Sequence, residues 1–417
     1  MVRRTLLVLL LALGLTACAS TGFVTGTSGR PAGLYPGAGG SIAPESRKVS
    51  ILLPLSGPLA PVGQSMLQAA EIVLEAPGSP QFKAFDTEGT PSGAAAAAQQ
   101  AVAYGAGIIL GPLTSADTGA AAPVARQASI PMLAFTNDQS QARPGVWVLG
   151  ITPAQQVQRL VAALQSRGKT RLAALLPDSE FGAAMQEALQ SAASAAGDPP
   201  PTIQMYSSGI GSINDAVRIV SDYADRRGPI QAQISAARAL DNTAGRARMH
   251  ELEREPIPPP PFDALLLAAT GTDLQEIAAF LPYYDLDPGT VQVVGPILWQ
   301  EPAARRGAGM GGAWYAAPDP ASRQQFADAY AAKFGSPPPA LADLAFDAAA
   351  LARVLAQGPG YSVAALTNPS GFTGADGVMA LRPDGEVARG LAVFAIGAGG
   401  EATVLDPAPT VLAGPGT

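Results

Sequence analysis

The sequence has very few of the residues on which disulfides, metal sites and much of catalysis depend. Of its 417 residues, one is a cysteine, Cys18, and one is a histidine, His250. A single cysteine excludes an intramolecular disulfide. A single histidine excludes sites with several histidine ligands and most histidine-based catalysis. We therefore expect no cofactor and no metal, and packing has to stabilise the fold.

Charged residues are also scarce, at 14%, and the balance is acidic, with a formal net charge of −7. An acidic chain without a basic stripe argues against nucleic acid as a partner. It argues equally against electrostatic binding to anionic lipid. Beyond residue 17 the sequence contains no apolar run of the roughly 18 residues that span a bilayer. We expect that no transmembrane helix follows the N-terminal segment.

The N-terminal residues have the pattern of a secretory signal. Arg3 and Arg4 precede an apolar run at residues 6–15, which is too short for a stable membrane span. The run ends in Leu15-Thr16-Ala17-Cys18, which resembles the lipobox of bacterial lipoproteins. The resemblance implies a signal peptide at residues 1–17 and lipidation of Cys18. An ordinary signal peptide with an incidental cysteine is the alternative.

The residues after the cysteine extend this expectation. Ala19 follows Cys18, and in the sorting of lipoproteins a residue other than aspartate there implies the outer membrane. Residues 18–46 are rich in Gly, Ser, Thr, Pro and Ala and have no apolar period, which indicates a flexible tether. We expect a periplasmic protein that contacts the membrane through its lipid anchor.

From residue 47 onward, short apolar runs alternate with helical patterns. This alternation predicts βαβ units and parallel sheets, hence an α/β fold. A chain of this length exceeds the roughly 250–300 residues at which one core stops growing, so we expect two lobes. The helices include 64–75 and 92–106, the second capped by Ser92. The predicted strands are 49–55, 82–86, 107–112, 131–135, 171–176, 201–206, 264–268 and 291–298, followed by a hairpin of 377–381 and 391–396.

Ligands on parallel sheets bind beyond the carboxyl ends of the strands. In the first half of the chain these ends are residues 55–57, 86–88, 111–115 and 135–137. Acidic residues also follow strands, as Asp86, Glu88, Asp178 and Glu180 do, but nothing pairs them into a catalytic set. Residues 230–255 form an unusually long polar helical stretch.

Several motifs together resemble the type I periplasmic binding proteins, the leucine/isoleucine/valine-binding type. They occur in the family's order between residues 48 and 397: Leu53-Pro54-Leu55-Ser56-Gly57-Pro58, Gly111-Pro112-Leu113-Thr114-Ser115, Asp178-Ser179-Glu180-Phe181-Gly182, Phe346-Asp347-Ala348 and Gly371-Phe372-Thr373-Gly374-Ala375-Asp376-Gly377. The resemblance implies two doubly wound parallel-sheet lobes joined by three hinge crossovers, with a ligand cleft between them.

The resemblance also implies domain boundaries. Residues 47–150 with 291–361 form lobe 1, residues 151–290 with 362–400 form lobe 2, and residues 401–417 form a tail. The hinges then lie near residues 150–152, 287–291 and 361–366.

The ligand-binding residues are expected by resemblance alone. In amino-acid-binding members, positions matching Thr114 and Ser115 hold the ligand carboxylate, and a helix N-terminus there suits an anion. The aromatic residue matching Phe181 closes from the second lobe. The full expected set is Ser56, Gly57, Leu113, Thr114, Ser115, Ala134, Phe135, Thr136, Phe181 and Gly271.

The sequence departs from the amino-acid-binding pattern. Residues 148–150 are Val-Leu-Gly where the binding proteins carry an arginine. Asp273 and Glu276 are only neighbours of the region that supplies the second-lobe acid. With the extra residues 230–255, the chain looks more like the lipoprotein activators of penicillin-binding proteins, whose C-terminal domain has this fold and contacts a peptidoglycan synthase.

Three hypotheses follow. The first is a non-enzymatic activator whose partner is a penicillin-binding protein. The second is a solute-binding protein that delivers a branched-chain or other amino acid, or a similar small ligand, to an ABC permease. The third, an enzyme acting in the cleft, has the least support because no coherent catalytic set is present.

Overall fold

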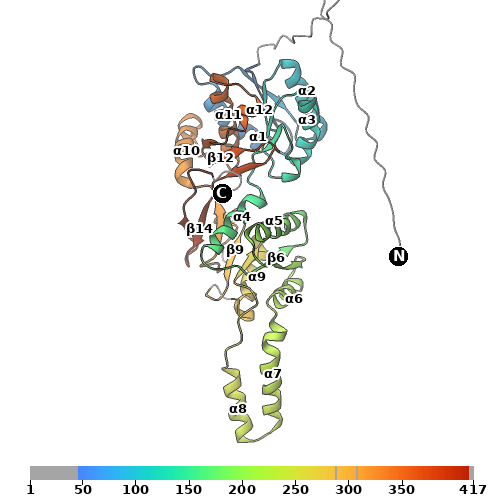
Figure 1. The fold of residues 1–417 in the computed structure, drawn as a ribbon, viewed down its shortest axis with the longest axis vertical. Coiled ribbons are helices and arrows are strands. Elements are labelled where there is room, and N and C mark those ends of the chain that lie inside the picture. Colours follow the sequence, from blue (N-terminus) through green and yellow to red (C-terminus); the bar gives the residue numbers. More distant parts are fainter. Residues whose placement is uncertain (1–45, 287–288, 307–308, 413–417) are drawn as a thin grey trace, which may run out of the picture. The chain divides into compact units, whose positions relative to one another are not determined.

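The computed structural model describes residues 46–286, 289–306 and 309–412 (Figure 1). The lipobox, Cys18 and nearly all of the expected tether lie outside these ranges. Within them, every helix is too short or too polar to cross a membrane.

The first sheet has five parallel strands in the order β2-β1-β3-β4-β5. Alternate residues of β1 face opposite sides. Val49, Ile51 and Leu53 pack with helices α1 (Ala60–Leu74) and α11 (Ala342–Gln357), whereas Leu52 packs with α2 (Pro91–Tyr104) and α3 (Ser115–Gln127). The strands are β1 (Val49–Leu53), β2 (Phe82–Asp86), β3 (Ile108–Leu110), β4 (Met132–Ala134) and β5 (Val146–Val148).

The second sheet has seven strands in the order β15-β14-β10-β9-β8-β6-β7. Its five strands from β10 to β7 are parallel, and β14 and β15 are antiparallel additions at one edge. Helices α4 (Pro153–Gln165) and α5 (Glu180–Ala196) cover one face, and α6 (Ile210–Val220) and α9 (Gly271–Phe280) cover the other. The strands are β6 (Leu172–Pro177), β7 (Thr202–Tyr206), β8 (Ala264–Leu267), β9 (Gln292–Gly295), β10 (Trp314–Ala317), β14 (Ala392–Ile396) and β15 (Ala402–Asp406).

A third, small antiparallel sheet consists of β11 (Phe372–Gly374), β12 (Gly377–Leu381) and β13 (Val387–Arg389). Met379, Leu381 and Val387 of this sheet belong to the same buried cluster as β1. The Trp147 indole Nε1 of β5 donates a hydrogen bond of 2.7 Å to the carbonyl of Arg382. The small sheet therefore belongs to the first lobe.

The expected α/β fold with doubly wound parallel sheets is confirmed, but the lobe boundaries differ from the expected ones. Residues 292–317 are expected in lobe 1, yet β9 pairs with β8 and β10 pairs with β9 in the second sheet. Residues 372–389 had been expected in lobe 2, yet they pack on the first. The expected tail contains β15, which extends the second sheet. An apolar pattern predicts a strand but does not indicate which sheet the strand joins.

The chain passes between the two cores three times. The first passage, at residues 149–152, coincides with the hinge expected at 150–152. The second lies between β10 and α10 (Pro320–Phe334), since α10 packs beside α1 through Phe326 and Tyr330. The third lies between β13 and β14. The hinges expected at 287–291 and 361–366 are wrong, because the elements on both sides of each belong to one core; residues 287–288 themselves lie outside the described ranges.

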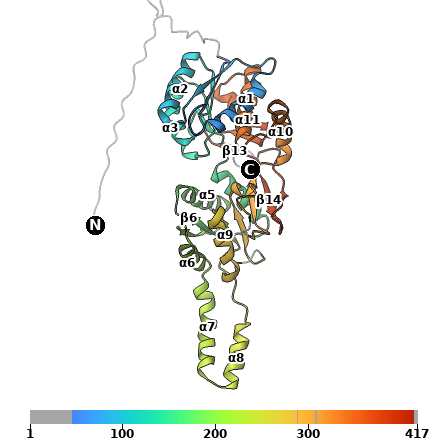
Figure 2. The same cartoon turned by 180° about the vertical axis from the view of Figure 1, so that it is seen from behind.

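Two local predictions also change. The polar stretch 230–255 is a pair of helices, α7 (Tyr223–Ala239) and α8 (Thr243–Glu253), because the chain reverses at Leu240 and Asp241 takes a positive φ of 45°. The two helices run side by side away from the second sheet (Figures 1 and 2). The expected hairpin of 377–381 with 391–396 is wrong, because β12 pairs with β13 and residues 392–396 form β14 of the second sheet.

Candidate ligand-binding cleft

A cleft of about 1440 Å³ is lined by elements of both lobes. The first lobe contributes the segments that follow β3 and β4, together with the start of α11; the second contributes α5 and η3 (Ile297–Gln300). Six of the expected site residues line it, namely Leu113, Thr114, Ser115, Phe135, Thr136 and Phe181. The other four, Ser56, Gly57, Ala134 and Gly271, are not among its lining residues.

The backbone at the end of β3 requires glycine. Gly111 has a φ of 97°, and a Cβ there would lie 2.1 Å from the carbonyl oxygen of Leu52. The chain then enters α3, whose N-cap Thr114 accepts a hydrogen bond of 3.1 Å from the backbone N–H of Asp117. Thr114 and Ser115 therefore lie at a helix N-terminus on the cleft wall.

The Ser115 hydroxyl, however, donates a hydrogen bond to Oδ2 of Asp138. The backbone N–H of Ser140 donates to Oδ1 of the same carboxylate over 3.0 Å. Burial raises the pKa of Asp138, but the hydrogen bonds from Ser115, Ser140 and Gln141 outweigh it and hold this pKa below its ordinary value. A negative charge of the protein thus lies beside the position that the resemblance gives to the ligand carboxylate.

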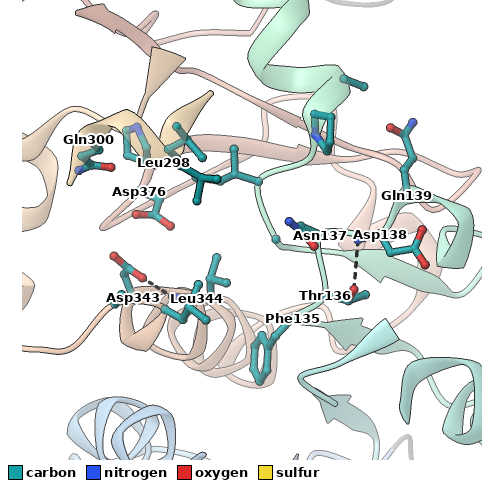
Figure 3. Close-up of a pocket in the computed structure, with 18 of the residues that line it drawn as sticks. Phe135, Thr136, Asn137, Asp138, Gln139, Leu298, Gln300, Asp343, Leu344 and Asp376 are labelled. Atoms are coloured by element: carbon teal, nitrogen blue, oxygen red, sulfur yellow. Dashed lines mark hydrogen bonds between the residues drawn. The ribbon is translucent and has the colours of Figure 1, made fainter. Parts of the chain in front are cut away.

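A second acidic group lies at the other end of the cleft, where the carboxylates of Asp343 and Asp376 face one another (Figure 3). Asp343 is ion-paired with Arg323 over 2.6 Å. Asp376 is only 3% exposed, and burial, with Asp343 as the second cause, raises its pKa well above the ordinary value. The nearest cation to Asp376 is Arg389, at 3.9 Å.

Acidic side chains outnumber basic ones in the lining by seven to one. Among the described lining residues the only base is Arg323, which is already paired with Asp343. Apolar side chains, including Phe135, Phe181 and Leu344, and uncharged polar side chains supply the rest of the wall. The carboxylates are those of Asp138, Glu180, Glu187, Glu301, Asp319, Asp343 and Asp376. Such a wall favours cations and repels anions.

Partial signals for these acidic groups are present in the sequence. Asp138 directly follows the predicted strand end 135–137, so its position at the sheet edge can be predicted from the sequence. Asp376 stands within the quoted motif at 371–377, but nothing in that motif shows that its side chain reaches a cleft. Asp343 and Glu187 lie in helices, and only the packing of α11 and α5 brings them to the wall.

Asp86, one of the acidic residues noted at the strand ends, has a structural role. Oδ1 of Asp86 accepts hydrogen bonds from the backbone N–H groups of Leu55 and Glu88, over 2.8 and 2.7 Å, and so joins the loops after β1 and β2. Across the described ranges, no group of three potential ligands is arranged to hold a metal ion.

Comparison with known proteins agrees with this architecture. Residues 46–203 match the family model described as periplasmic binding protein. No curated protein matches the chain. Among solved structures, a putative branched-chain amino acid ABC transporter from Rhodospirillum rubrum is 17% identical with a TM-score of 0.65, over 86% of this chain and 100% of that one.

Two further solved structures are similar over most of the chain. The leucine-binding protein LivK from Thermotoga maritima is 17% identical with a TM-score of 0.52, over 86% of this chain and 97% of that one. The C-domain of LpoA from Haemophilus influenzae, described as a regulator of PBP1A, is 14% identical with a TM-score of 0.59, over 86% of this chain and 99% of that one. The resemblance to type I periplasmic binding proteins is thereby confirmed at the level of the fold.

Proposed function

We propose that this protein is a non-enzymatic regulator of a peptidoglycan synthase, a penicillin-binding protein, and that it acts through protein contact. It is held in the periplasm by lipid on Cys18, at the outer membrane. The observation that carries the proposal is the hydrogen bond from Ser115 to Asp138. By the resemblance, Ser115 lies where an amino-acid receptor holds the carboxylate of its ligand; a protein carboxylate already bonded to Ser115 would repel that group.

The contact surface proposed for the partner is the helical hairpin α7–α8. Its two helices pack against each other through a small buried apolar cluster, formed by Ile230, Ile234, Ala237 and Leu252. At the far end Arg238 and Arg246 are exposed, and Leu240 is 60% exposed. Binding of this surface shifts the synthase toward its active conformation, provided that the active form binds more tightly than the inactive one.

Capture of the partner tests the proposal. The tagged full-length chain is expressed in its own bacterium, and co-purified penicillin-binding proteins are detected by labelling with a fluorescent penicillin. We expect capture of a labelled synthase, at least tenfold weaker with the double variant Arg238→Glu, Leu240→Ser. The matched control is Arg218→Glu, Ile219→Ser on α6, which also changes an exposed arginine and an exposed apolar residue. Equal capture by both variants would exclude the hairpin as the contact surface. No capture by the wild type would contradict the proposed function.

The second candidate is a solute-binding protein that delivers an amino acid to an ABC permease. The size of the cleft, about 1440 Å³, favours it, since the volume accommodates a small ligand. A ligand at one hundred times its Kd raises the free energy of unfolding by about 2.7 kcal/mol. A rise in melting temperature with a branched-chain amino acid would support this candidate. The regulator proposal predicts no rise with any of the common amino acids.

A further inference from the structure

Asp376 is a buried acid without a hydrogen-bonding partner at the wall of the cleft. It stands in the turn between β11 and β12, and its side chain is 4% exposed. Within the described part of the chain, no donor reaches its carboxylate within hydrogen-bond distance. The Arg389 guanidinium is 3.9 Å away and donates instead to the carbonyl of Leu149, over 2.6 Å. A buried carboxylate in this state is costly, and a bound cation would relieve the cost.

A second carboxylate increases the need for a cation at this end. Asp343, from the first turn of α11, faces Asp376 (Figure 3). Among the described residues its ion-pair partner is Arg323, whose Nε donates a hydrogen bond of 2.6 Å to Oδ2 of Asp343. Arg389 is the second nearby cation, 3.9 Å from Asp376, but among the described residues neither arginine donates a hydrogen bond to the Asp376 carboxylate. The pair therefore offers a place for an additional positive charge.

The far end of the same cleft carries another anion. Asp138 lies at the opposite side of the view in Figure 3, with Phe135 and Leu344 between it and the pair of Asp343 and Asp376. Phe135 and Leu344 are each 3% exposed, belong to the core of the first lobe, and contribute a small apolar area to the wall between the two acidic ends. The arrangement is acidic, then apolar, then acidic.

We propose that the cleft binds a linear aliphatic diamine or polyamine. One ammonium group lies between Asp343 and Asp376, a second lies at Asp138, and the alkyl chain covers Phe135 and Leu344. The spacing of charge fits a ligand with two separated cations, whereas an amino acid would bring a carboxylate against Asp138. The inference concerns the cleft and does not depend on the partner proposed for the hairpin.

Titration calorimetry on the purified full-length protein tests this inference, with 1,5-diaminopentane and spermidine as probes. We expect saturable binding of at least one probe. N-acetyl-1,5-diaminopentane keeps one cation and is expected to bind at least tenfold more weakly, and 1,5-pentanediol, which has none, is expected not to bind. If neither amine binds at millimolar concentration, or if the acetylated amine binds equally well, the inference is wrong.

Substitutions locate the binding. Asp376→Asn and Asp138→Asn are each expected to weaken the binding at least tenfold. Asp215→Asn is the matched control, because it removes the same charge from an acidic protein at a side chain that is 63% exposed on α6, away from the cleft. Equal weakening by Asp215→Asn would show that the amine binds only to the overall negative charge. If Asp376→Asn fails to fold, Asp138→Asn still tests the proposed site.

The two proposals fail separately. Loss of amine binding in the cleft variants with synthase capture unchanged leaves the regulator role intact. Loss of capture in the hairpin variant with amine binding unchanged leaves the ligand site intact. A rise in melting temperature with leucine but not with the amines would contradict both.

Discussion

At the scale of single residues, Gly374 and Asp347 lie in a contact that leaves no room for a side chain. A Cβ on Gly374 would lie 2.3 Å from the carboxyl carbon of Asp347. Asp347 cannot move aside easily, because its two oxygens accept hydrogen bonds from the backbone N–H groups of Ala375 and Asp376, over 2.5 and 3.1 Å. This contact fixes the β11–β12 turn that positions Asp376 at the cleft.

We predict that Gly374→Ala lowers the free energy of unfolding by about 2–3 kcal/mol, because a buried overlap forces the backbone to shift. Denaturation by urea, monitored by circular dichroism, measures the change. Gly211→Ala in α6 is the control, since a Cβ there meets nothing within 4 Å, and alanine favours a helix. Equal effects of the two substitutions would contradict the prediction.

The buried Asp347 also makes stability depend on pH. Burial raises its pKa to about 6, against 3.8 for an ordinary aspartate, despite the hydrogen bonds from Ala375 and Asp376 and the charge of Arg389. Between these values the folded protein holds a proton that the unfolded chain has released. The contribution to stability is complete below about pH 4 and is lost as pH rises through 6.

We therefore predict that the wild type loses roughly 3 kcal/mol relative to Asp347→Asn between pH 4 and pH 7.5, because asparagine does not titrate. Urea denaturation of both proteins at each pH measures this difference. Comparing the two proteins cancels the contributions of other carboxylates whose pKa values are lowered, such as Asp138 and Asp263. A difference that is independent of pH would show that Asp347 has an ordinary pKa.

At the scale of elements, the start of α2 shows how a cap is chosen among neighbouring hydroxyl residues. The sequence predicted Ser92 as the cap, but the helix begins at Pro91 with Thr90 as its N-cap. The Thr90 hydroxyl accepts a hydrogen bond of 3.1 Å from the backbone N–H of Gly93. Proline suits the first position of a helix, which places the cap one residue before it.

We predict that Thr90→Ala lowers the free energy of unfolding by about 1 kcal/mol, whereas Ser92→Ala changes it by only a few tenths. Thermal and urea denaturation of the two variants measure the difference. A larger loss of unfolding free energy with Ser92→Ala would contradict this prediction and show that Ser92 is the cap.

At the scale of the whole molecule, the helical hairpin is attached to the second lobe at the base of α7, where Tyr223 packs on Tyr283 and Tyr284 and Arg226 is buried. Arg226 donates hydrogen bonds to the carbonyls of Pro258, Ser221 and Tyr284, over 2.7, 3.0 and 3.2 Å. Beyond this point the hairpin has its own small apolar cluster. It is therefore an appendage whose removal leaves both sheet cores complete.

We predict that replacing residues 229–256 with a short glycine–serine linker changes the melting temperature by only a few degrees. Arg226→Ala in the full chain is expected to cost more, about 2–3 kcal/mol, because three buried carbonyls lose their donor. Calorimetry compares the two variants. A large loss on removing the hairpin would mean that it is part of the folding core.

The sequence by itself determined the alternation of strands and helices, the doubly wound character of the sheets and much of the first-lobe wall of the cleft. These features depend on apolar period and on turn residues such as Gly111, which are local. Tertiary structure alone decided that β9 and β10 join the second sheet, that β11–β13 join the first, and that Asp138, Asp343 and Asp376 line one cleft. Sheet membership and charge clustering depend on contacts between residues far apart in the chain, and no local pattern records them.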